Sequence, residues 1–199
     1  MGVQNQWNQL YKTATAEKLP WFTITLDKDV SLALKKFKPV TKTVLSVGEG
    51  PGTQAIALAQ KGFHVTGTDI SRAAIEQAQV RCRQAGATVE FRIDDITKSK
   101  LTKTFGLIVD RGCFHTLNPK DRLQYIRNVR RLLEPNGTLF LKCFSEKEKM
   151  EGGPNRFSPE EITERFGKFF EIQSVTETEF EGTLYPFPKA LFFVLKKKD

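Results

Sequence analysis

The residues of this chain that could do chemistry are concentrated in a glycine-rich segment and in a series of acids that follow it. Gly48-Glu49-Gly50-Pro51-Gly52 comes directly after an apolar stretch and before a segment with helical spacing. Glycine has no Cβ, so this backbone can approach a ligand closely, and a helix that begins here presents free N–H groups. Asp69 follows about 20 residues later, a spacing that suits hydrogen bonds to the hydroxyls of a ribose.

The spacing of these glycines argues against a dinucleotide as the ligand. A dinucleotide fingerprint would place its third glycine at position 53, under the pyrophosphate, whereas this chain has Gly52 followed by Thr53. Glu49 inside the turn would repel a pyrophosphate, because like charges repel in a partly dry site. The same carboxylate suits a ligand that carries a cationic amino group and a sulfonium. A tight structural turn without a ligand is the alternative interpretation.

Further acids at the ends of expected strands favour a binding site over a structural turn. Asp94-Asp95-Ile96 follows the third expected strand, and Asp110 ends the fourth. Parallel α/β sheets bind ligands outside the carboxyl ends of their strands, where these acids, Asp69 and the glycine segment would all lie. We therefore expect one ligand-binding crevice at this edge of the sheet.

The elements that must position these residues alternate between strands and helices from residue 43 onward. The expected strands are TVLSV, FHVTGTD, VEFRI, FGLIV, TLFLKCF, FEIQSV and ALFFVL. The expected helices lie near 53–61, after the cap Ser71, at 123–133 and at 158–166. The apolar face of the second comprises Ile75, Ala78, Cys82 and Ala85, and that of the third comprises Leu123, Ile126, Val129 and Leu133.

Strands separated by helix-length segments predict parallel pairing with right-handed crossovers. The expected fold class is α/β, with a single Rossmann-like domain. Its seven-stranded sheet is mostly parallel, with an antiparallel hairpin at the carboxyl-terminal end and helices on both faces. Residues 1–199 are expected to form this one domain, with its core in 41–199.

Residues 1–40 are expected to form a helical lid over the crevice. Trp7, Leu10, Tyr11 and Ala14 have helical spacing, Pro20-Trp21 breaks it, and a second helix begins after the cap Asp27. Trp7, Tyr11 and Trp21 could then cover a bound ligand with apolar surface. Ordinary core packing of these aromatic residues is the alternative.

Composition places the chain among globular proteins, with 39% hydrophobic and 27% charged residues. No apolar run is long enough to span a bilayer, and the first residues lack a basic segment followed by an apolar one, so we expect neither a membrane partner nor export. Cys82, Cys113 and Cys143 lack metal-ligand spacing, which predicts no metal site and a reducing, cytoplasmic location. The formal net charge of +8 could attract nucleic acid, but Lys and Arg are spread along the chain, which favours a solvated surface.

The motifs, in this order, resemble those of the class I S-adenosylmethionine-dependent methyltransferases over roughly residues 40–198. VLSVGEGPG looks like the cofactor loop, VTGTDIS the ribose strand and FRIDDI the adenine-contacting segment. GLIVDRGCFHTL and LLEPNGTLFLKCF look like the fourth and fifth strands with their loops. The amino-terminal W-x-x-x-Y and PW, with DRG-x-FH and GGP, are most similar to the small-molecule branch that includes tellurite-resistance and thiol or thiopurine methyltransferases.

The resemblance implies a site for S-adenosylmethionine, with S-adenosylhomocysteine as the product. By that resemblance Gly48, Gly50 and Gly52 would face the amino-acid end of the cofactor, Asp69 the ribose, and Asp95 with the Ile96 backbone the adenine. Asp110 and Arg111 would border the transferred methyl group, and Glu49, Ile70 and Trp21 would complete the cofactor contacts. Many relatives have an acid two residues before the first glycine, whereas this chain has Ser46, so that polar role would be altered or pass to Glu49.

The candidates for catalysis near the expected methyl group are His115 and Asp110. Histidine titrates in a range that suits proton transfer, so His115 is expected either to act as a general base or to orient its loop. Cys113 lies in the same loop without a neighbour that would activate a thiol nucleophile. A base is optional, because alignment and exclusion of water can supply most of the acceleration of an in-line methyl transfer.

We therefore expect a methyltransferase that acts on a small molecule, with a thiol, a soft anion or a metalloid oxyanion favoured as acceptor. An RNA or protein methyltransferase, or a cofactor-binding protein without turnover, is the alternative. Enzymes that methylate exocyclic base amines carry [DN]-P-P-[YFW] after the fourth strand, which Asp110-Arg111-Gly112-Cys113 does not match, so a nucleic-acid partner is disfavoured although other RNA targets stay open. A monomer or a weak homodimer is expected.

Overall fold

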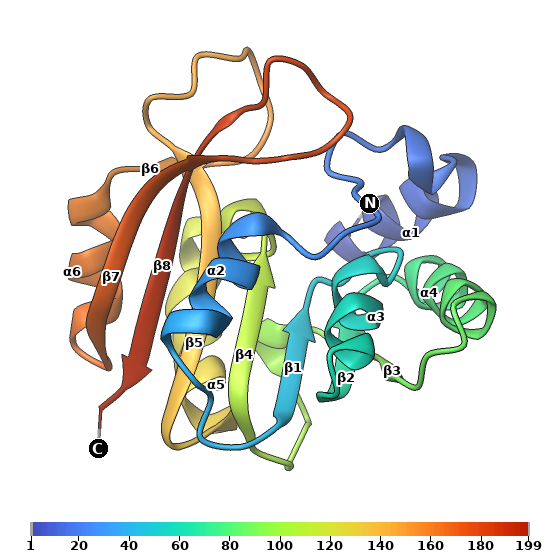
Figure 1. Cartoon of the computed structure of the whole chain (residues 1–199). Helices are drawn as coiled ribbons and strands as arrows, with labels where there is room; N and C mark the ends of the chain where they lie inside the picture. Colours follow the sequence, from blue (N-terminus) through green and yellow to red (C-terminus); the bar gives the residue numbers. More distant parts are fainter. Residues whose placement is uncertain (1, 199) are drawn as a thin grey trace.

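The computed structural model of the chain describes residues 2–198, in which a central sheet lies between helices on its two faces (Figure 1). The helices are α1 (Val3–Thr13), α2 (Lys28–Lys36), α3 (Thr53–Gln60), α4 (Arg72–Gln84), α5 (Arg122–Leu132) and α6 (Pro159–Gly167). Short 3-10 turns are η1 (Ala16–Lys18), η2 (Ile96–Lys98), η3 (Phe114–Thr116) and η4 (Pro119–Asp121). The strands are β1 (Thr43–Val47), β2 (His64–Asp69), β3 (Glu90–Ile93), β4 (Phe105–Arg111), β5 (Leu133–Ser145), β6 (Arg156–Phe157), β7 (Phe170–Glu179) and β8 (Lys189–Lys197).

Seven strands cross the sheet in the order β3-β2-β1-β4-β5-β8-β7, and β6 pairs with β5 outside this order. The strands β1 to β5 pair in parallel with their neighbours, whereas β8 is antiparallel to both β5 and β7. The predicted α/β class and the mostly parallel sheet with antiparallel strands at the carboxyl-terminal end are confirmed. The additional strand β6 has only two residues, which is too short for any pattern in the sequence to reveal.

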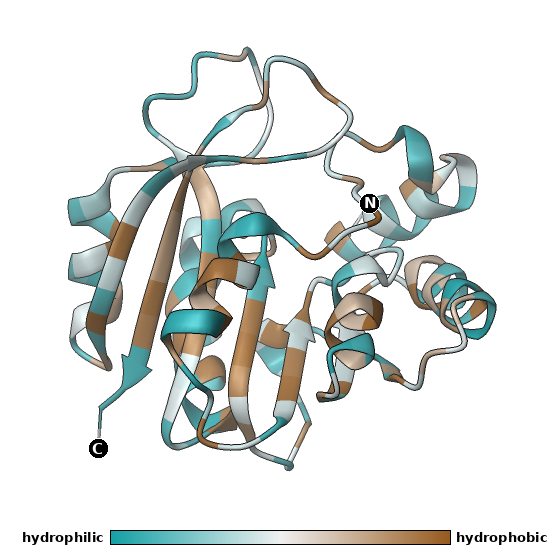
Figure 2. Ribbon diagram, viewed as in Figure 1, coloured by the Kyte–Doolittle hydropathy of each residue, from teal (hydrophilic) through white to brown (hydrophobic). Residues whose placement is uncertain are grey.

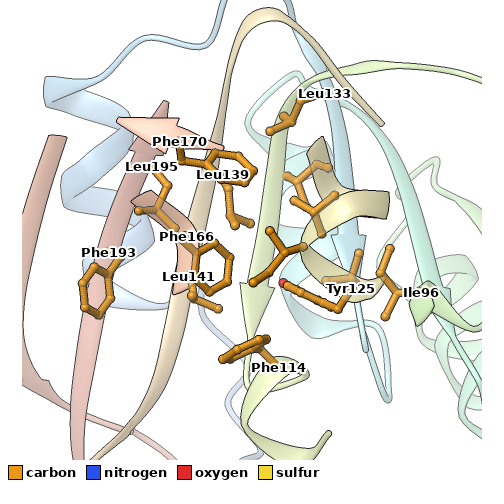
Figure 3. Packing of buried hydrophobic residues seen from close by; sticks show 14 of the residues in the cluster. Ile96, Phe114, Tyr125, Leu133, Leu139, Leu141, Phe166, Phe170, Phe193 and Leu195 are labelled. Atoms are coloured by element: carbon orange, nitrogen blue, oxygen red, sulfur yellow. The ribbon is translucent and has the colours of Figure 1, made fainter. Parts of the chain in front are cut away.

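The sheet buries apolar side chains on both faces, because successive residues of a strand point to opposite sides. Leu139 and Leu141 of β5 belong to the cluster that includes residues of α5 and α6, part of which Figure 3 shows. Phe140, between them, packs into the cluster formed with α2 and α3. Figure 2 accordingly shows hydrophobic residues concentrated in the central strands, which the helices cover.

The buried face of α5 differs from the prediction. Ile126 and Val129 are buried as predicted, and the face also includes Tyr125 and Leu132. Leu123 is 48% exposed, and Leu133 is buried but already belongs to β5. Tyr125 explains the difference, because its hydroxyl donates a hydrogen bond to a buried carboxylate of β4 and so fixes the rotation of the helix. Polar anchoring of this kind cannot be read from apolar periodicity.

The predicted face of α4 is wrong at its last residue. Ala85 is exposed, because the helix ends at Gln84 and Ala85 is its carboxyl-terminal cap. Ile75, Ala78 and Cys82 are buried as predicted.

Both predicted helix caps are confirmed. Oδ1 of Asp27 accepts a hydrogen bond from the N–H of Asp29 (3.0 Å) at the start of α2. The hydroxyl of Ser71 accepts one from the N–H of Ala74 (3.1 Å) at the start of α4. Such caps satisfy N–H groups that have no partner within the helix, and they fix where each helix begins.

The amino-terminal segment packs against the start of α4, close to the ends of β1 and β2 (Figure 1). Oδ1 of Asn8 in α1 accepts a hydrogen bond from the N–H of Ala73 (2.9 Å), and the Gln77 side chain donates to the main-chain oxygen of Tyr11 (2.6 Å). The helices of residues 2–198 include none with the length and apolar character needed to traverse a bilayer.

Candidate functional site

The predicted site residues converge at the carboxyl edge of the parallel strands. The ends of β2, β1 and β4 lie side by side, since Val47 of β1 is aligned with Thr68 of β2 and with Asp110 of β4. The glycine segment leaves the sheet directly after Val47, and Asp69 ends β2. The topology thus brings together residues more than 60 positions apart in the chain, as the sequence predicted.

The glycine segment forms a loop whose three glycines all have positive φ angles. Each is also tightly packed against a different part of the protein. A Cβ would lie 2.6 Å from Cβ of Cys113 at Gly48, 2.6 Å from the hydroxyl of Tyr11 at Gly50, and 2.7 Å from Cβ of Ala78 at Gly52. Only glycine satisfies both the backbone conformation and these contacts.

The Glu49 side chain is buried and reaches the amino-terminal end of α3. One carboxylate oxygen accepts a hydrogen bond from the N–H of Ala55 (2.9 Å), and the other accepts one from the hydroxyl of Ser46. Burial raises the pKa of Glu49 to about 7, although these hydrogen bonds oppose the increase. The chain therefore places its own carboxylate where helix N–H groups would otherwise receive an anionic ligand such as a pyrophosphate.

Asp69 is buried at the end of β2 and holds the glycine loop. Its Oδ2 accepts a hydrogen bond from the N–H of Gly50 (2.8 Å), and its Oδ1 accepts one from the N–H of Ser71 (2.8 Å). Burial raises the pKa of Asp69 against the effect of these hydrogen bonds. Each oxygen of a carboxylate has two lone pairs, so the side chain keeps acceptor capacity for further donors.

The segment after β3 places two carboxylates beside each other with different partners. Oδ1 of Asp95 accepts hydrogen bonds from the N–H (2.9 Å) and the hydroxyl (2.7 Å) of Thr97, which fixes the turn η2. Ile96 is buried, and Ile70 is half-buried after β2. Oδ2 of Asp94 is buried without a hydrogen-bond partner in the described structure, a feature that the sequence alone did not single out.

Asp110 is fully engaged by its own loop. Its carboxylate accepts hydrogen bonds from the N–H groups of Gly112 (3.0 Å), Cys113 (2.7 Å) and Phe114 (3.0 Å) and from the hydroxyl of Tyr125 (2.5 Å). Burial raises the pKa of Asp110 to about 6, in opposition to these four hydrogen bonds. The geometry indicates that Asp110 shapes the loop after β4, with four donors already around its two oxygens.

His115 lies in that loop as a buried, neutral imidazole. Its Nδ1 accepts a hydrogen bond from the N–H of Phe144 (3.1 Å), and its ring stacks on Phe180 at a centroid distance of 5.5 Å. Burial and the nearby charge of Arg111 lower the pKa of His115 to about 3. A general base needs a free lone pair and a pKa near the working pH, so the structure favours the orienting role of the two roles considered.

His115 also joins two loops through its main chain. Its carbonyl oxygen accepts hydrogen bonds from the N–H (2.9 Å) and the side-chain amide (2.7 Å) of Asn155. The loop after β4 is thereby held against the connection between β5 and β6.

Trp21 and Arg111 border a small cavity next to the glycine loop. The cavity has a volume of about 30 Å³, room for little more than a water molecule, and its other walls include Phe22, Gly48 and Glu49. The Arg111 side chain is only 7% exposed, and its guanidinium group contacts Asp27 and two main-chain oxygens. Arg111 therefore uses most of its hydrogen-bonding capacity within the protein, and its place beside the transferred methyl group stays a prediction.

Cys113 is half-buried, and the low solvation of its thiol together with the charge of Asp110 raises its pKa well above the usual range. A neutral thiol is a poor nucleophile, in agreement with the role disfavoured from sequence. Within residues 2–198 no cluster of His, Cys, Asp and Glu is arranged to hold a metal ion.

Two residues at the site were not assigned to it from the sequence. Gln54 accepts a hydrogen bond from the N–H of Asp27 (2.8 Å) and donates one to the carbonyl of Thr25 (3.1 Å), so it fastens the amino-terminal segment to α3. Lys142 is fully buried in β5, where a charged residue in the apolar run TLFLKCF was the available signal. Asp94 was expected at this edge of the sheet together with Asp95, and only Asp95 was assigned to the cofactor.

Comparison with known proteins agrees with this geometry. A family model described as a methyltransferase domain matches residues 44–137. An uncharacterized methyltransferase of Schizosaccharomyces pombe is 30% identical over 109 residues, which cover 54% of this chain and 75% of that protein.

Two further proteins match over most of the chain. The 2-heptyl-1-hydroxyquinolin-4(1H)-one methyltransferase of Mycobacteroides abscessus is 25% identical over 182 residues, which cover 87% of this chain and 80% of that protein. The crystal structure of an S-adenosylmethionine-dependent methyltransferase from Anabaena variabilis has a TM-score of 0.80 at 21% identity and covers 100% of this chain and 96% of that one, which shows a common fold.

Proposed function

Because this chain belongs to the class I S-adenosylmethionine-dependent methyltransferases, we propose that it transfers the methyl group of this cofactor to a small-molecule acceptor held beneath its amino-terminal segment. The observation that carries the proposal is the cover over the glycine loop. The hydroxyl of Tyr11 lies 2.6 Å from the position that a Cβ on Gly50 would occupy, and Trp21 and Phe22 wall the adjoining cavity. A cover this close to the glycine loop favours an acceptor small enough to be enclosed beneath it.

The residues of the crevice fit the cofactor of this family. The Glu49 carboxylate already occupies the amino-terminal end of α3, which suits a cofactor that has no phosphate and carries a positive charge. Asp69 keeps free lone pairs for ribose hydroxyls, and Asp95 with the Ile96 backbone lies at the neighbouring strand end for the adenine. Gly48, Gly50, Gly52, Ile70 and Trp21 would complete the contacts.

When bound, the cofactor supplies an electrophilic methyl group on a sulfonium, and the protein has to align the acceptor and exclude water. Glu49 and Asp69 provide negative charge around the positively charged donor. Asp110 and His115 hold the loop after β4 in place, and that loop contacts the glycine segment through Cys113 and Gly48. The protein thereby fixes one wall of the acceptor site relative to the cofactor.

The acceptor class that suits these surroundings needs no base from the protein. The Asp110 carboxylate already receives four hydrogen bonds, and His115 is neutral with its Nδ1 occupied. A thiol that reacts as its thiolate, a soft anion or a metalloid oxyanion can attack without proton transfer to either residue. We therefore favour these acceptors.

Residues 1–40 would act as the lid of this site. Within the described residues, which start at residue 2, the contacts of α1 and Tyr11 support this role. The Gln4 side chain donates a hydrogen bond to the main-chain oxygen of Ile70 (3.2 Å), and the Asn8 side chain accepts one from the N–H of Ala73. The first contact lies at Ile70, which is expected to contact the cofactor, and the second lies at the start of α4.

The test is a screen of acceptors scored by release of S-adenosylhomocysteine. Thiols, halides, metalloid oxyanions and amines are compared with RNA and with a protein mixture as methyl acceptors. Turnover with at least one small acceptor, and none with the polymers, is the expected result. Turnover with RNA alone, accompanied by a salt-dependent gel shift, would refute the small-molecule proposal while leaving the family assignment intact.

A further inference from the structure

A cluster of four charged side chains lies buried where the amino-terminal segment meets the sheet. It contains two acids, Asp27 and Asp29, and two bases, Arg111 and Lys142, so its formal charge is zero. None of the four side chains is more than 8% exposed. Burying charges is costly unless each is paired, and such pairs contribute little to stability compared with apolar packing. The cluster therefore calls for an explanation other than stability.

The inner part of the cluster ties the start of α2 to the sheet. Nζ of Lys142 donates to Oδ2 of Asp27 (2.8 Å) and to Oδ2 of Asp29 (2.6 Å), and the hydroxyl of Thr178 in β7 donates to the same oxygen of Asp29 (2.9 Å). Burial alone would raise the pKa of Asp27, but the charges of Lys142 and Arg111 lower it. Asp27 is thus a fixed anion at the junction between the lid and the core.

Arg111 forms the outer part and contacts three segments at once. Its Nε donates to Oδ2 of Asp27 (2.8 Å), one terminal nitrogen donates to the main-chain oxygen of Trp21 (2.9 Å), and the other donates to that of Glu181. The guanidinium group also lies over the ring of Phe180, 4.6 Å from its centroid. A planar guanidinium can make these three contacts together, which an ammonium group cannot.

The two segments that Arg111 joins also contact each other directly. The N–H of Thr183 donates to the main-chain oxygen of Pro20 (2.9 Å), and its hydroxyl donates to that of Leu19 (3.0 Å). Gly182 packs so closely against the main-chain oxygen of Pro20 that a Cβ would not fit there. Residues 19–22 and 180–183 therefore form one cover with two arms, and Arg111 is the charged residue at the point where the arms meet.

The cover must move for a ligand to enter. The cavity beneath Trp21 holds about 30 Å³, far less than the amino-acid portion of the cofactor requires. Separation of the arms from Arg111 would open this cavity, while the inner cluster of Asp27, Asp29 and Lys142 would remain paired.

We propose that Arg111 is a positioning residue that fastens both arms of the cover, and that release of the Trp21 and Glu181 oxygens from its guanidinium group opens the cofactor crevice. This inference rests on the lid role given to residues 1–40 under the proposed function. It assigns Arg111 to control of ligand entry and exit, beyond its expected place beside the methyl group.

The chain carries its own probe for this movement. Its only tryptophans are Trp7 and Trp21, both in the amino-terminal segment, with ring centroids 6.0 Å apart. Intrinsic tryptophan fluorescence therefore reports on Trp21 in the cover and on Trp7 in α1, whose ring lies against that of Trp21. Quenching of this fluorescence by acrylamide measures how often the cover is open, and stopped-flow fluorescence measures the dissociation of S-adenosylhomocysteine.

The decisive variant is Arg111→Lys, with Arg131→Lys as its matched control. Lysine keeps the charge beside Asp27 but cannot reach all three acceptors. Arg131 also donates to two main-chain oxygens, those of Leu101 (2.6 Å) and Ser99 (3.0 Å), in a loop that is not part of the cover. We expect Arg111→Lys to raise the acrylamide quenching constant severalfold and to speed dissociation of S-adenosylhomocysteine about tenfold, as for loss of one charge-assisted hydrogen bond. Arg131→Lys should change neither.

Unchanged quenching and an unchanged dissociation rate in Arg111→Lys would overturn the proposal, as would equal changes in both variants. The quenching measurement needs no ligand and neither measurement needs an acceptor, so failure of the small-molecule proposal would leave both results interpretable. Thermal unfolding of the two variants separates opening of the cover from destabilisation of the whole domain. Destabilisation of the whole domain would lower the melting temperature together with the change in quenching.

Discussion

Replacement of Glu49 by glutamine should remove one contribution to the pH dependence of stability, about 3 kcal/mol between about pH 4 and pH 8. Burial raises the pKa of Glu49 from an ordinary value of 4.5 to about 7. The folded protein then holds this proton more tightly than the unfolded chain does, so the stabilisation is fully present below about pH 4.5 and is lost as the pH rises through about 7. At about 1.36 kcal/mol for each pH unit between the two values, the loss amounts to about 3 kcal/mol.

The measurement is the free energy of unfolding in urea for the wild type and for Glu49→Gln, from about pH 4 to about pH 8. Other titrating groups occur in both proteins, so the difference between the two curves isolates Glu49. Glutamine keeps an oxygen that can accept the N–H of Ala55 and has the same shape, which limits other effects. The wild type should lose about 3 kcal/mol relative to the variant across this range.

A second variant, Ser46→Ala, should shift the pH at which this stability is lost, and the structure predicts the direction of the shift. The hydroxyl of Ser46 donates to the Glu49 carboxylate and lowers its pKa, so Ser46→Ala should raise the midpoint of the pH-dependent loss. A difference curve without slope in Glu49→Gln, or a midpoint that falls in Ser46→Ala, would refute the view that a buried carboxylate fills the end of α3.

The remaining predictions concern binding, the cover, the imidazole and the buried lysine. Asp69→Asn should weaken binding of S-adenosylhomocysteine by about 1–3 kcal/mol in calorimetry, and unchanged affinity would mean that the ribose lies elsewhere. Gly50→Ala should lower the free energy of unfolding by more than the roughly 1–2 kcal/mol expected from its positive φ alone. The added Cβ would lie 2.6 Å from the Tyr11 hydroxyl but 3.4 Å from Cζ of the same ring, so adding Tyr11→Phe should recover part of the excess. An additive double-mutant cycle would contradict this packing. His115→Gln should leave the pH dependence of kcat/KM unchanged between about pH 6 and pH 8, because burial and the charge of Arg111 lower the pKa of His115 to about 3. If the variant lost a titration in that range, His115 would be the general base after all. Lys142→Met should destabilise the protein by about 3–5 kcal/mol in chemical unfolding, and a neutral effect would show that its two acids are not buried as anions.

Local patterns were sufficient to predict most of the fold. Strand and helix alternation, the caps Asp27 and Ser71 and the glycine loop are properties of a few neighbouring residues, and each reappears in the structure. The convergence of Asp69 and Asp110 on one edge also followed, because parallel strands end at the same side of a sheet.

The hydrogen-bond partners of each site residue could not be predicted from local patterns. Asp110 and Asp69 look alike in sequence, as acids at strand ends, but Asp110 receives four hydrogen bonds and Asp69 two. That difference depends on Tyr125, which is 15 positions away and was not part of the predicted apolar face of α5. The ion pairs of Lys142 could not be predicted either, because their partners Asp27 and Asp29 lie more than 110 positions earlier in the chain.

The distribution of charge in the site bears on the ligand more directly than the net charge of the chain does. The formal charge is +8, yet the carboxylates buried at the glycine loop and near the ends of β2 and β4 are those of Glu49, Asp69 and Asp110. Arg111, the cation that borders the cavity, is paired with Asp27 and so contributes little free positive charge. The surroundings favour a positively charged donor, and an anionic acceptor would be attracted by that donor rather than by the protein. Such an acceptor should therefore bind more weakly when S-adenosylhomocysteine, which has no sulfonium charge, replaces S-adenosylmethionine, and equal binding to both complexes would show that the protein itself supplies the attraction.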